Sequence, residues 1–219
     1  MLSLVIAMAL FVATHFLMSH PLRRPIVGAL GEKGFLGVYS LVSLVLLFWA
    51  VRAYGDAVGV QLWVAPFWLV VLGWLAMLKA AILFAGSLMA PNPALVQADG
   101  LLERVDEPRG VMRITRHPMM WSFAIWALVH ILVSGRSDTL VLAGGILILA
   151  LIGAAAQDVK KRALIGERWA AYTARTSYWP HLRWPGIAPV IAGLALYVLL
   201  VFIHPLIAGR PTGLLEIFA

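Results

Sequence analysis

Two histidines lie inside apolar stretches, where an ionisable side chain needs a partner or a task. His15 falls within ALFVATHFLMSH, and His130 ends the sequence PMMWSFAIWALVH. Twelve residues separate His130 from Pro118, about 18 Å of helix, which would place His130 well inside a hydrocarbon core about 30 Å thick. Neutral imidazole is the commonest protein ligand for metals, haem iron included. Either the two histidines bind a metal or a haem, or each bonds to a neighbouring helix.

Three basic residues are further candidates for holding a cofactor. Arg116 and His117 directly precede Pro118, and proline in the first turn of a helix has no N–H to lose. This pair is therefore expected at a helix entrance among lipid headgroups, where it is suited to bind a carboxylate or a nucleotide. Lys79 lies inside WLAMLKAAILF, and no Asp or Glu falls in any apolar segment. It either extends its stem to the water boundary or meets a cofactor carboxylate such as a haem propionate.

The elements that must position these residues are long apolar segments. The chain has 219 residues, 62% of them hydrophobic and 12% charged, and its mean hydropathy is +0.92. We predict an all-α fold, a single membrane domain over residues 1–219 that lies in a lipid bilayer and has no soluble module. Each segment approaches the ~20 residues that a helix needs to cross a bilayer. The six predicted spans run from Leu2 to Met18, Phe35 to Tyr54, Leu62 to Met89, Met119 to Val133, Thr139 to Ala156 and Ile187 to Ile207.

The basic residues are distributed unevenly among the loops. Thirteen Lys and Arg residues fall in the first, third and fifth loops, against three in the second loop, the fourth loop and the C-terminal tail. The positive-inside rule then places the first, third and fifth loops in the cytoplasm and both termini outside it. The pI near 10.3 is thus a topology signal, and we expect no nucleic-acid partner.

Several kinds of chemistry are excluded by what the sequence lacks. With no cysteine there is no disulfide, thiolate metal site or covalently attached c-type haem. The sequence also has no GxSxG or HExxH motif and no Walker or Rossmann glycine pattern.

The polar residues are concentrated in the third and fifth loops. The third loop is rich in proline and glycine and is predicted to be irregular, whereas the fifth should begin as an amphipathic continuation of its helix. We expect the two loops to fold together, with Arg116 or His117 in contact with the region of Asp158 or Glu167.

Three motifs in order resemble the NnrU family of bacterial membrane proteins. They are HFLMS in the first span, RITRHPMMW followed thirteen positions later by His130, and GERWAAYTARTSYWP. The resemblance implies a bacterial inner-membrane protein with periplasmic termini, associated with denitrification through nitrite and nitric oxide metabolism. The chain also resembles the 15-cis-zeta-carotene isomerases, which are haem b proteins. That resemblance implies haem b bound by His15 and His130, an apolar polyene or a gas as ligand, and an unidentified redox partner.

A wider resemblance reaches membrane methyltransferases that act on isoprenylcysteine or phospholipid and bind S-adenosylmethionine. Two positions of their RHPxYxG pattern differ, because Met120 and Ser122 replace the tyrosine and the glycine. The sequence therefore leaves open whether the chain is a haem-dependent isomerase, a methyltransferase or a cofactor-free assembly partner of respiratory enzymes. The matching residues are Arg116, His117, Pro118, Gly166, Glu167 and Tyr172, with Asp158 where a glutamate is usual.

Overall fold

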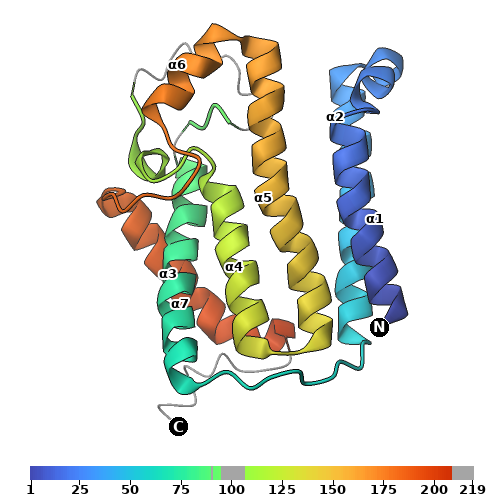
Figure 1. The fold of residues 1–219 in the computed structure, drawn as a ribbon, viewed down its shortest axis with the longest axis vertical. Coiled ribbons are helices and arrows are strands. Elements are labelled where there is room, and N and C mark those ends of the chain that lie inside the picture. Colours follow the sequence, from blue (N-terminus) through green and yellow to red (C-terminus); the bar gives the residue numbers. More distant parts are fainter. Residues whose placement is uncertain (90, 95–106, 209–219) are drawn as a thin grey trace. The chain divides into compact units, whose positions relative to one another are not determined.

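The computed structural model is a bundle of apolar α-helices and describes residues 1–89, 91–94 and 107–208 (Figure 1). Five helices are long and apolar enough to cross a membrane, and a sixth apolar helix, α4, is shorter. The all-α prediction is therefore confirmed. The elements are α1 Leu2–Ser19, α2 Arg23–Gly55, α3 Phe67–Met89, the 3-10 turn η2 Gly110–Arg113, α4 Pro118–Ser134, α5 Ser137–Ile165, α6 Glu167–Arg175 and α7 Ile187–Ala208.

These elements form two compact units. The first contains residues 1–65 and 130–149, and the second contains residues 66–129 and 150–219. Both units take part of α4 and part of α5, so no linker separates them. The prediction of a single domain stays a prediction, as do the cytoplasmic assignment of the basic loops and the outward termini.

In the first unit, α1 packs against α2 and against the first half of α5. Gly145 of α5 allows a close approach, since a Cβ there would clash with the Met8 side chain and lie 3.6 Å from that of Val12. The buried centre of this contact is wholly apolar, as expected for lipid-facing helices that meet by close packing. It consists of Leu4, Ala7, Met8, Phe11, Ala50 and Ala53.

The predicted start of the second span at Phe35 is wrong, because α2 begins at Arg23. Residues placed in the first loop by their charge, including Lys33, therefore lie in a helix. Gly31 interrupts that helix with φ of 70°, a left-handed conformation that glycine adopts without a Cβ clash. The interruption separates residues 23–30, which begin with Arg23 and Arg24, from the longer part of α2.

The predicted start of the third span at Leu62 is also wrong, because α3 begins at Phe67. Residues 60–63 form hydrogen bonds with the turn between α4 and α5 and are not part of a helix. Leu62 N donates to Gly135 O at 2.7 Å, and Trp63 Nε1 donates to Leu132 O at 2.9 Å. Pro66 then disfavours a helical conformation for the residue before it, so the helix starts only after the proline.

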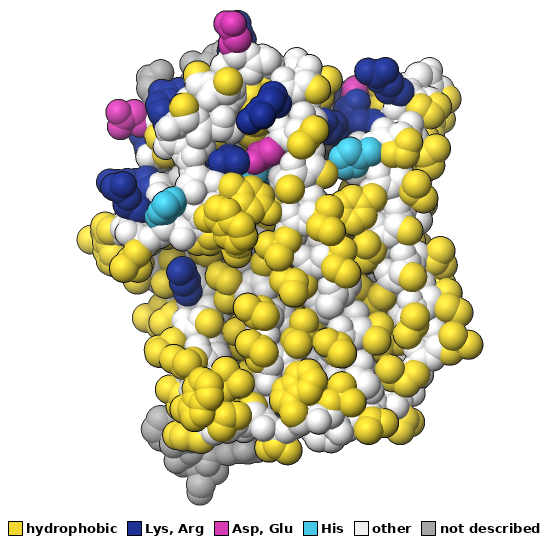
Figure 2. All heavy atoms as spheres, in the orientation of Figure 1, with side chains coloured by type: hydrophobic (Ala, Val, Ile, Leu, Met, Phe, Trp, Pro, Cys, Tyr) yellow, Lys and Arg dark blue, Asp and Glu magenta, His cyan; other side chains and the backbone are white. Residues whose placement is uncertain are grey.

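In the second unit, α3 packs against α7, and the polar end of α5 leads into α6. The 29 residues of α5 would extend about 43 Å, more than a hydrocarbon core about 30 Å thick. Its C-terminal part therefore leaves the apolar layer, and Figure 2 shows Lys and Arg side chains gathered over α6 and this end of α5. The predicted helical continuation is confirmed, but Lys161 is only 5% exposed, so the basic residues of this end do not all face water. The described part of the third loop holds only the 3-10 turn, and residues 95–106 lie outside the described residues.

Candidate functional site

The strongest polar cluster in the second unit joins Arg116 and His117, just before α4, to Asp158 on α5. Arg116 Nε donates to Asp158 Oδ2 at 2.8 Å, and its Nη2 reaches the same oxygen. His117 Nε2 donates to Asp158 Oδ1 at 2.7 Å. The side chains of His117, Arg116 and Asp158 are 1%, 12% and 16% exposed. The predicted contact between the third and fifth loops is confirmed.

Hydrogen bonds to the segment after α6 hold this cluster in place. Arg116 N donates to Ser177 O at 2.8 Å, and Thr115 Oγ1 donates to Tyr178 O at 2.7 Å. Trp121 Nε1 donates to the same carbonyl at 2.7 Å. Tyr178 Oη in turn donates to Leu151 O at 2.7 Å, and the tyrosine ring lies 5.7 Å from the Arg116 guanidinium. These contacts position Arg116 and the residues beside it, which favours one fixed geometry.

The arrangement leaves little charge free for a ligand. Arg116 donates through both Nε and Nη2 to the Asp158 carboxylate, and the His117 imidazole takes the other oxygen. The basic pair that the sequence assigned to a cofactor carboxylate thus already holds the carboxylate of Asp158.

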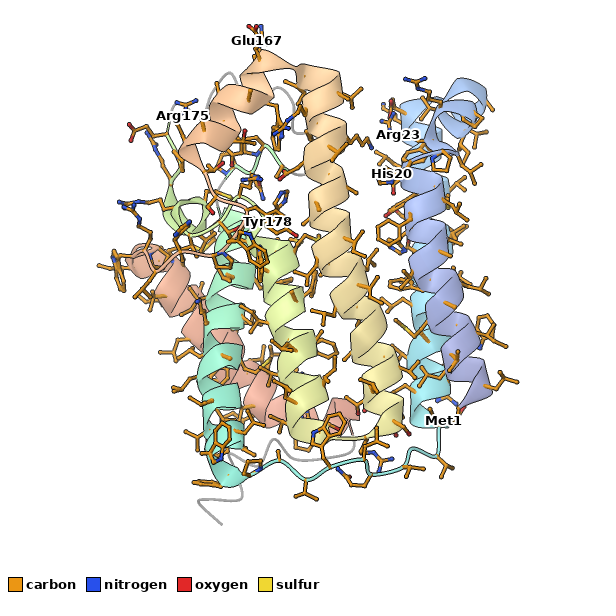
Figure 3. All side chains as sticks on the ribbon, in the orientation of Figure 1. Met1, His20, Arg23, Glu167, Arg175 and Tyr178 are labelled. Atoms are coloured by element: carbon orange, nitrogen blue, oxygen red, sulfur yellow. The ribbon has the colours of Figure 1, made fainter. Side chains whose placement is uncertain are left out.

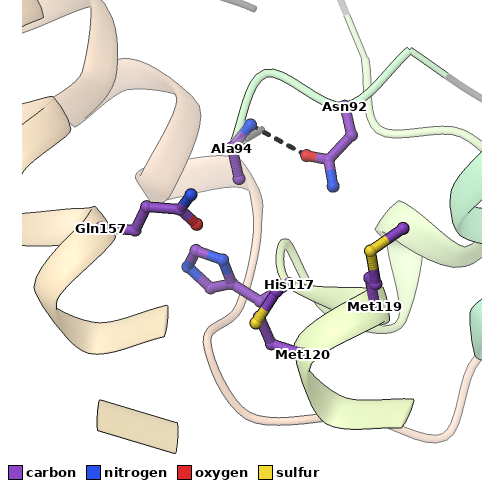
Figure 4. A pocket seen from close by; sticks show the side chains of 6 residues that line it. All are labelled: Asn92, Ala94, His117, Met119, Met120 and Gln157. Atoms are coloured by element: carbon purple, nitrogen blue, oxygen red, sulfur yellow. Dashed lines mark hydrogen bonds between the residues drawn. The ribbon is translucent and has the colours of Figure 1, made fainter. Parts of the chain in front are cut away.

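A small cavity lies beside His117. Figure 4 shows the imidazole directed into the space between Gln157 and Ala94. The cavity volume is about 10 Å³, enough for about one water molecule and far too little for a nucleotide-sized cofactor among the described residues. Its lining is Asn92, Ala94, His117, Met119, Met120 and Gln157.

Two buried polar groups near this cavity have no hydrogen-bond partner among the described residues. They are Trp169 Nε1 and Tyr172 Oη, on side chains that are 0% and 2% exposed. Both residues lie on α6 and pack with Ala94, which also lines the cavity. Burial raises the pKa of Tyr172 to about 12, so the phenol stays protonated near neutral pH. Sequence reasoning missed Trp169, although its three-residue spacing from Tyr172 marks one apolar face of an amphipathic helix.

In the first unit, His15 on α1 has the geometry of a prepared ligand. Its Nδ1 donates to the carbonyl oxygen of Phe11 at 2.7 Å, because a carbonyl can only accept. A neutral imidazole with this tautomer carries a lone pair on Nε2, the atom that binds a metal. The half-buried ring also contacts Phe11, at 4.4 Å between ring centroids, and Tyr39 of α2, at 5.3 Å.

His130 is half-buried on α4 in the same unit, but the helix register does not bring it level with His15. Ser134 Oγ and Thr139 Oγ1 are hydrogen bonded at 2.9 Å across the short turn at which the chain reverses between α4 and α5. His130 is therefore close in depth to Gly145, and Gly145 faces Met8 and Val12. His15 lies three residues beyond Val12 and seven beyond Met8 along α1, so the two imidazoles differ in depth by about 5 to 10 Å of helical rise.

Lys79 lies exposed on α3, in the second unit. Its assignment to a cofactor carboxylate stays a prediction. Among the described residues no group of three or more His, Cys, Asp or Glu side chains is arranged to hold a metal ion.

The fold and this site define the class of the protein as an integral α-helical membrane protein with a buried ion-paired cluster at the polar end of one unit. The chain matches the NnrU protein family over residues 3–212 and therefore belongs to that family. It is 37% identical over 82 residues to the chloroplastic 15-cis-zeta-carotene isomerase of Zea mays. That match covers 35% of this chain and 22% of the maize protein, so it spans about a fifth of the relative's length. No solved structure matches the chain.

Proposed function

We propose that this NnrU protein binds haem b through His15 and isomerises a polyene dissolved in the bilayer, in a bacterial inner membrane. The observation that carries the proposal is the hydrogen bond from His15 Nδ1 to Phe11 O, at 2.7 Å within an apolar helix. Ligand histidines commonly donate their second nitrogen in this way, which fixes the tautomer and the ring orientation. The name of the maize relative supports the choice of substrate class.

The residues around His15 suit this task. The Phe11 carbonyl holds the proton on Nδ1 and keeps Nε2 as an electron-pair donor, while the Tyr39 ring fixes the imidazole from the side of α2. Bound haem iron supplies a Lewis-acidic centre that exchanges single electrons. The apolar helix surfaces around His15 would exclude water and admit an apolar substrate from the lipid.

The difference in depth between the two histidines supports a single protein ligand in this arrangement, with His130 a second ligand only after the helices shift. With His15 as the one protein ligand, a bound haem iron would be able to bind a substrate double bond or a gas such as nitric oxide. Binding of nitric oxide is the way in which this protein would take part in denitrification.

The test is to purify the protein in mild detergent from haem-replete cells and record its visible spectrum. We expect a Soret band. The preparation should then convert 15-cis-zeta-carotene to another geometric isomer, as resolved by liquid chromatography. A haem-free preparation of the same protein, which should leave the polyene unchanged, serves as the control. A coloured protein inert toward the polyene but binding nitric oxide would move the function to gas chemistry, and a colourless protein would end the proposal.

A second candidate, S-adenosylmethionine-dependent methyl transfer, is supported by the unpartnered donors Trp169 Nε1 and Tyr172 Oη beside His117. It is weakened by the engagement of Arg116 and His117 with Asp158. If this candidate is right, calorimetry should detect S-adenosylmethionine binding, and Tyr172→Phe should weaken it several-fold through loss of a donor. Heat equal to that of a buffer injection would exclude it. A protein that is colourless and also ignores S-adenosylmethionine would instead fit a cofactor-free assembly partner.

A further inference from the structure

Arg23, the first residue of α2, has an unsatisfied hydrogen-bond donor. Its Nη2 donates to both carboxylate oxygens of Glu32, at 3.0 and 2.9 Å, and its guanidinium lies over the Phe35 ring at 5.4 Å. The Nε atom is buried and has no hydrogen-bond partner among the described residues. A buried N–H without an acceptor is costly, so its presence at a charged group points to a missing oxyanion.

A line of aromatic side chains connects this guanidinium to the candidate ligand. Phe35 contacts Tyr39 at 5.8 Å between ring centroids, and Tyr39 contacts His15 at 5.3 Å. His15 also lies four residues before Ser19, the end of α1, about 6 Å of helical rise from the turn that leads to Arg23. Figure 3 shows Arg23 and His20 at this same end of the α1 and α2 pair.

We propose that Arg23 binds a propionate carboxylate of the haem whose iron His15 holds; this inference rests on the proposed function. A flat macrocycle held at His15 can lie along the line of rings and place its acidic edge at the polar end of the helices. There the Nε–H of Arg23 supplies a charge-assisted hydrogen bond, which guanidinium groups form readily with carboxylates. The assignment transfers to Arg23 the role that sequence reasoning gave to Lys79, which belongs to the other unit.

The test compares haem b with its dimethyl ester, in which both propionates are blocked. Haem-free protein is titrated with each compound, and affinity is read from the Soret absorbance. The wild type should bind the free acid about 10- to 100-fold more tightly than the ester. Arg23→Met, which keeps the apolar stem over Phe35, should reduce this ratio by about tenfold or more. The matched control is Arg24→Met, because Arg24 is an exposed neighbour and should leave the ratio unchanged.

The outcomes separate this inference from the function on which it rests. An unchanged acid-to-ester ratio in Arg23→Met would overturn the role of Arg23 while haem binding stands. If that variant instead loses co-purified phosphatidylglycerol, the oxyanion at Arg23 is a lipid phosphate, and the inference is equally overturned. A wild type with no Soret band would overturn both.

Discussion

The His15→Ala variant should purify almost free of haem, whereas His130→Ala should keep its Soret band. The affinity of His15→Ala for haem should fall by more than about 100-fold, because removing a group that merely orients a ligand already costs about 10- to 100-fold. The measurement is haem per protein by the pyridine haemochrome assay. Added imidazole should restore the band in His15→Ala by filling the space that the side chain leaves, which shows that the variant is folded.

The opposite pattern would be equally clear. Haem lost from His130→Ala but retained in His15→Ala would make His130 the ligand and contradict the assignment. Equal loss from both variants would mean that the helices shift until both imidazoles reach one iron, despite their difference in depth.

Replacing Asp158 with alanine should destabilise the protein by about 3–5 kcal/mol, because Arg116 and His117 would be left in a buried place without their shared acceptor. Unfolding in detergent with increasing dodecyl sulfate, followed by tryptophan fluorescence, measures the change. Glu167→Ala removes an exposed acid nearby and should stay within about 0.5 kcal/mol of the wild type.

A triple apolar variant distinguishes two causes of destabilisation: loss of the ion pair itself, and burial of a charge that has no partner. Arg116→Met, His117→Leu and Asp158→Leu together remove every charge of the cluster, and a well-packed apolar replacement of a buried ion pair is often neutral or stabilising. Most of the stability lost in Asp158→Ala should therefore return. If Asp158→Ala unfolds like the wild type, the cluster contributes nothing to the fold.

Most helix positions were predictable because apolar length alone decides whether a helix can cross a bilayer. The helices α1, α4 and α7 begin and end within one residue of the predicted spans. The predictions for α2 and α3 failed at their first residues for local reasons. A short helical stretch that begins with two arginines precedes Gly31, and the apolar residues before Pro66 are hydrogen bonded to another turn.

The contacts of the candidate site were predictable where a charged side chain needs an oppositely charged partner. They were less predictable where the packing of helices sets the positions of side chains. Asp158 and Glu167 are the two acids of an otherwise basic loop, which made their region the expected partner of Arg116 or His117. By contrast, apolar periodicity carries no signal for the register between helices, so the unequal depth of His15 and His130 appears only in the fold. The same holds for Arg23, whose buried Nε depends on the side chains that cover it.

The split of the first unit between residues 1–65 and 130–149 has a consequence for biosynthesis. When α1 and α2 have entered the bilayer, the α5 residues that pack on Met8 are still unmade, and so are the carbonyls that receive Leu62 and Trp63. About 80 further residues must be translated, which takes about 4 to 16 s at about 5–20 residues per second. Throughout that interval the N-terminal helical pair waits in the membrane with lipid, or an insertion chaperone, in place of its third helix.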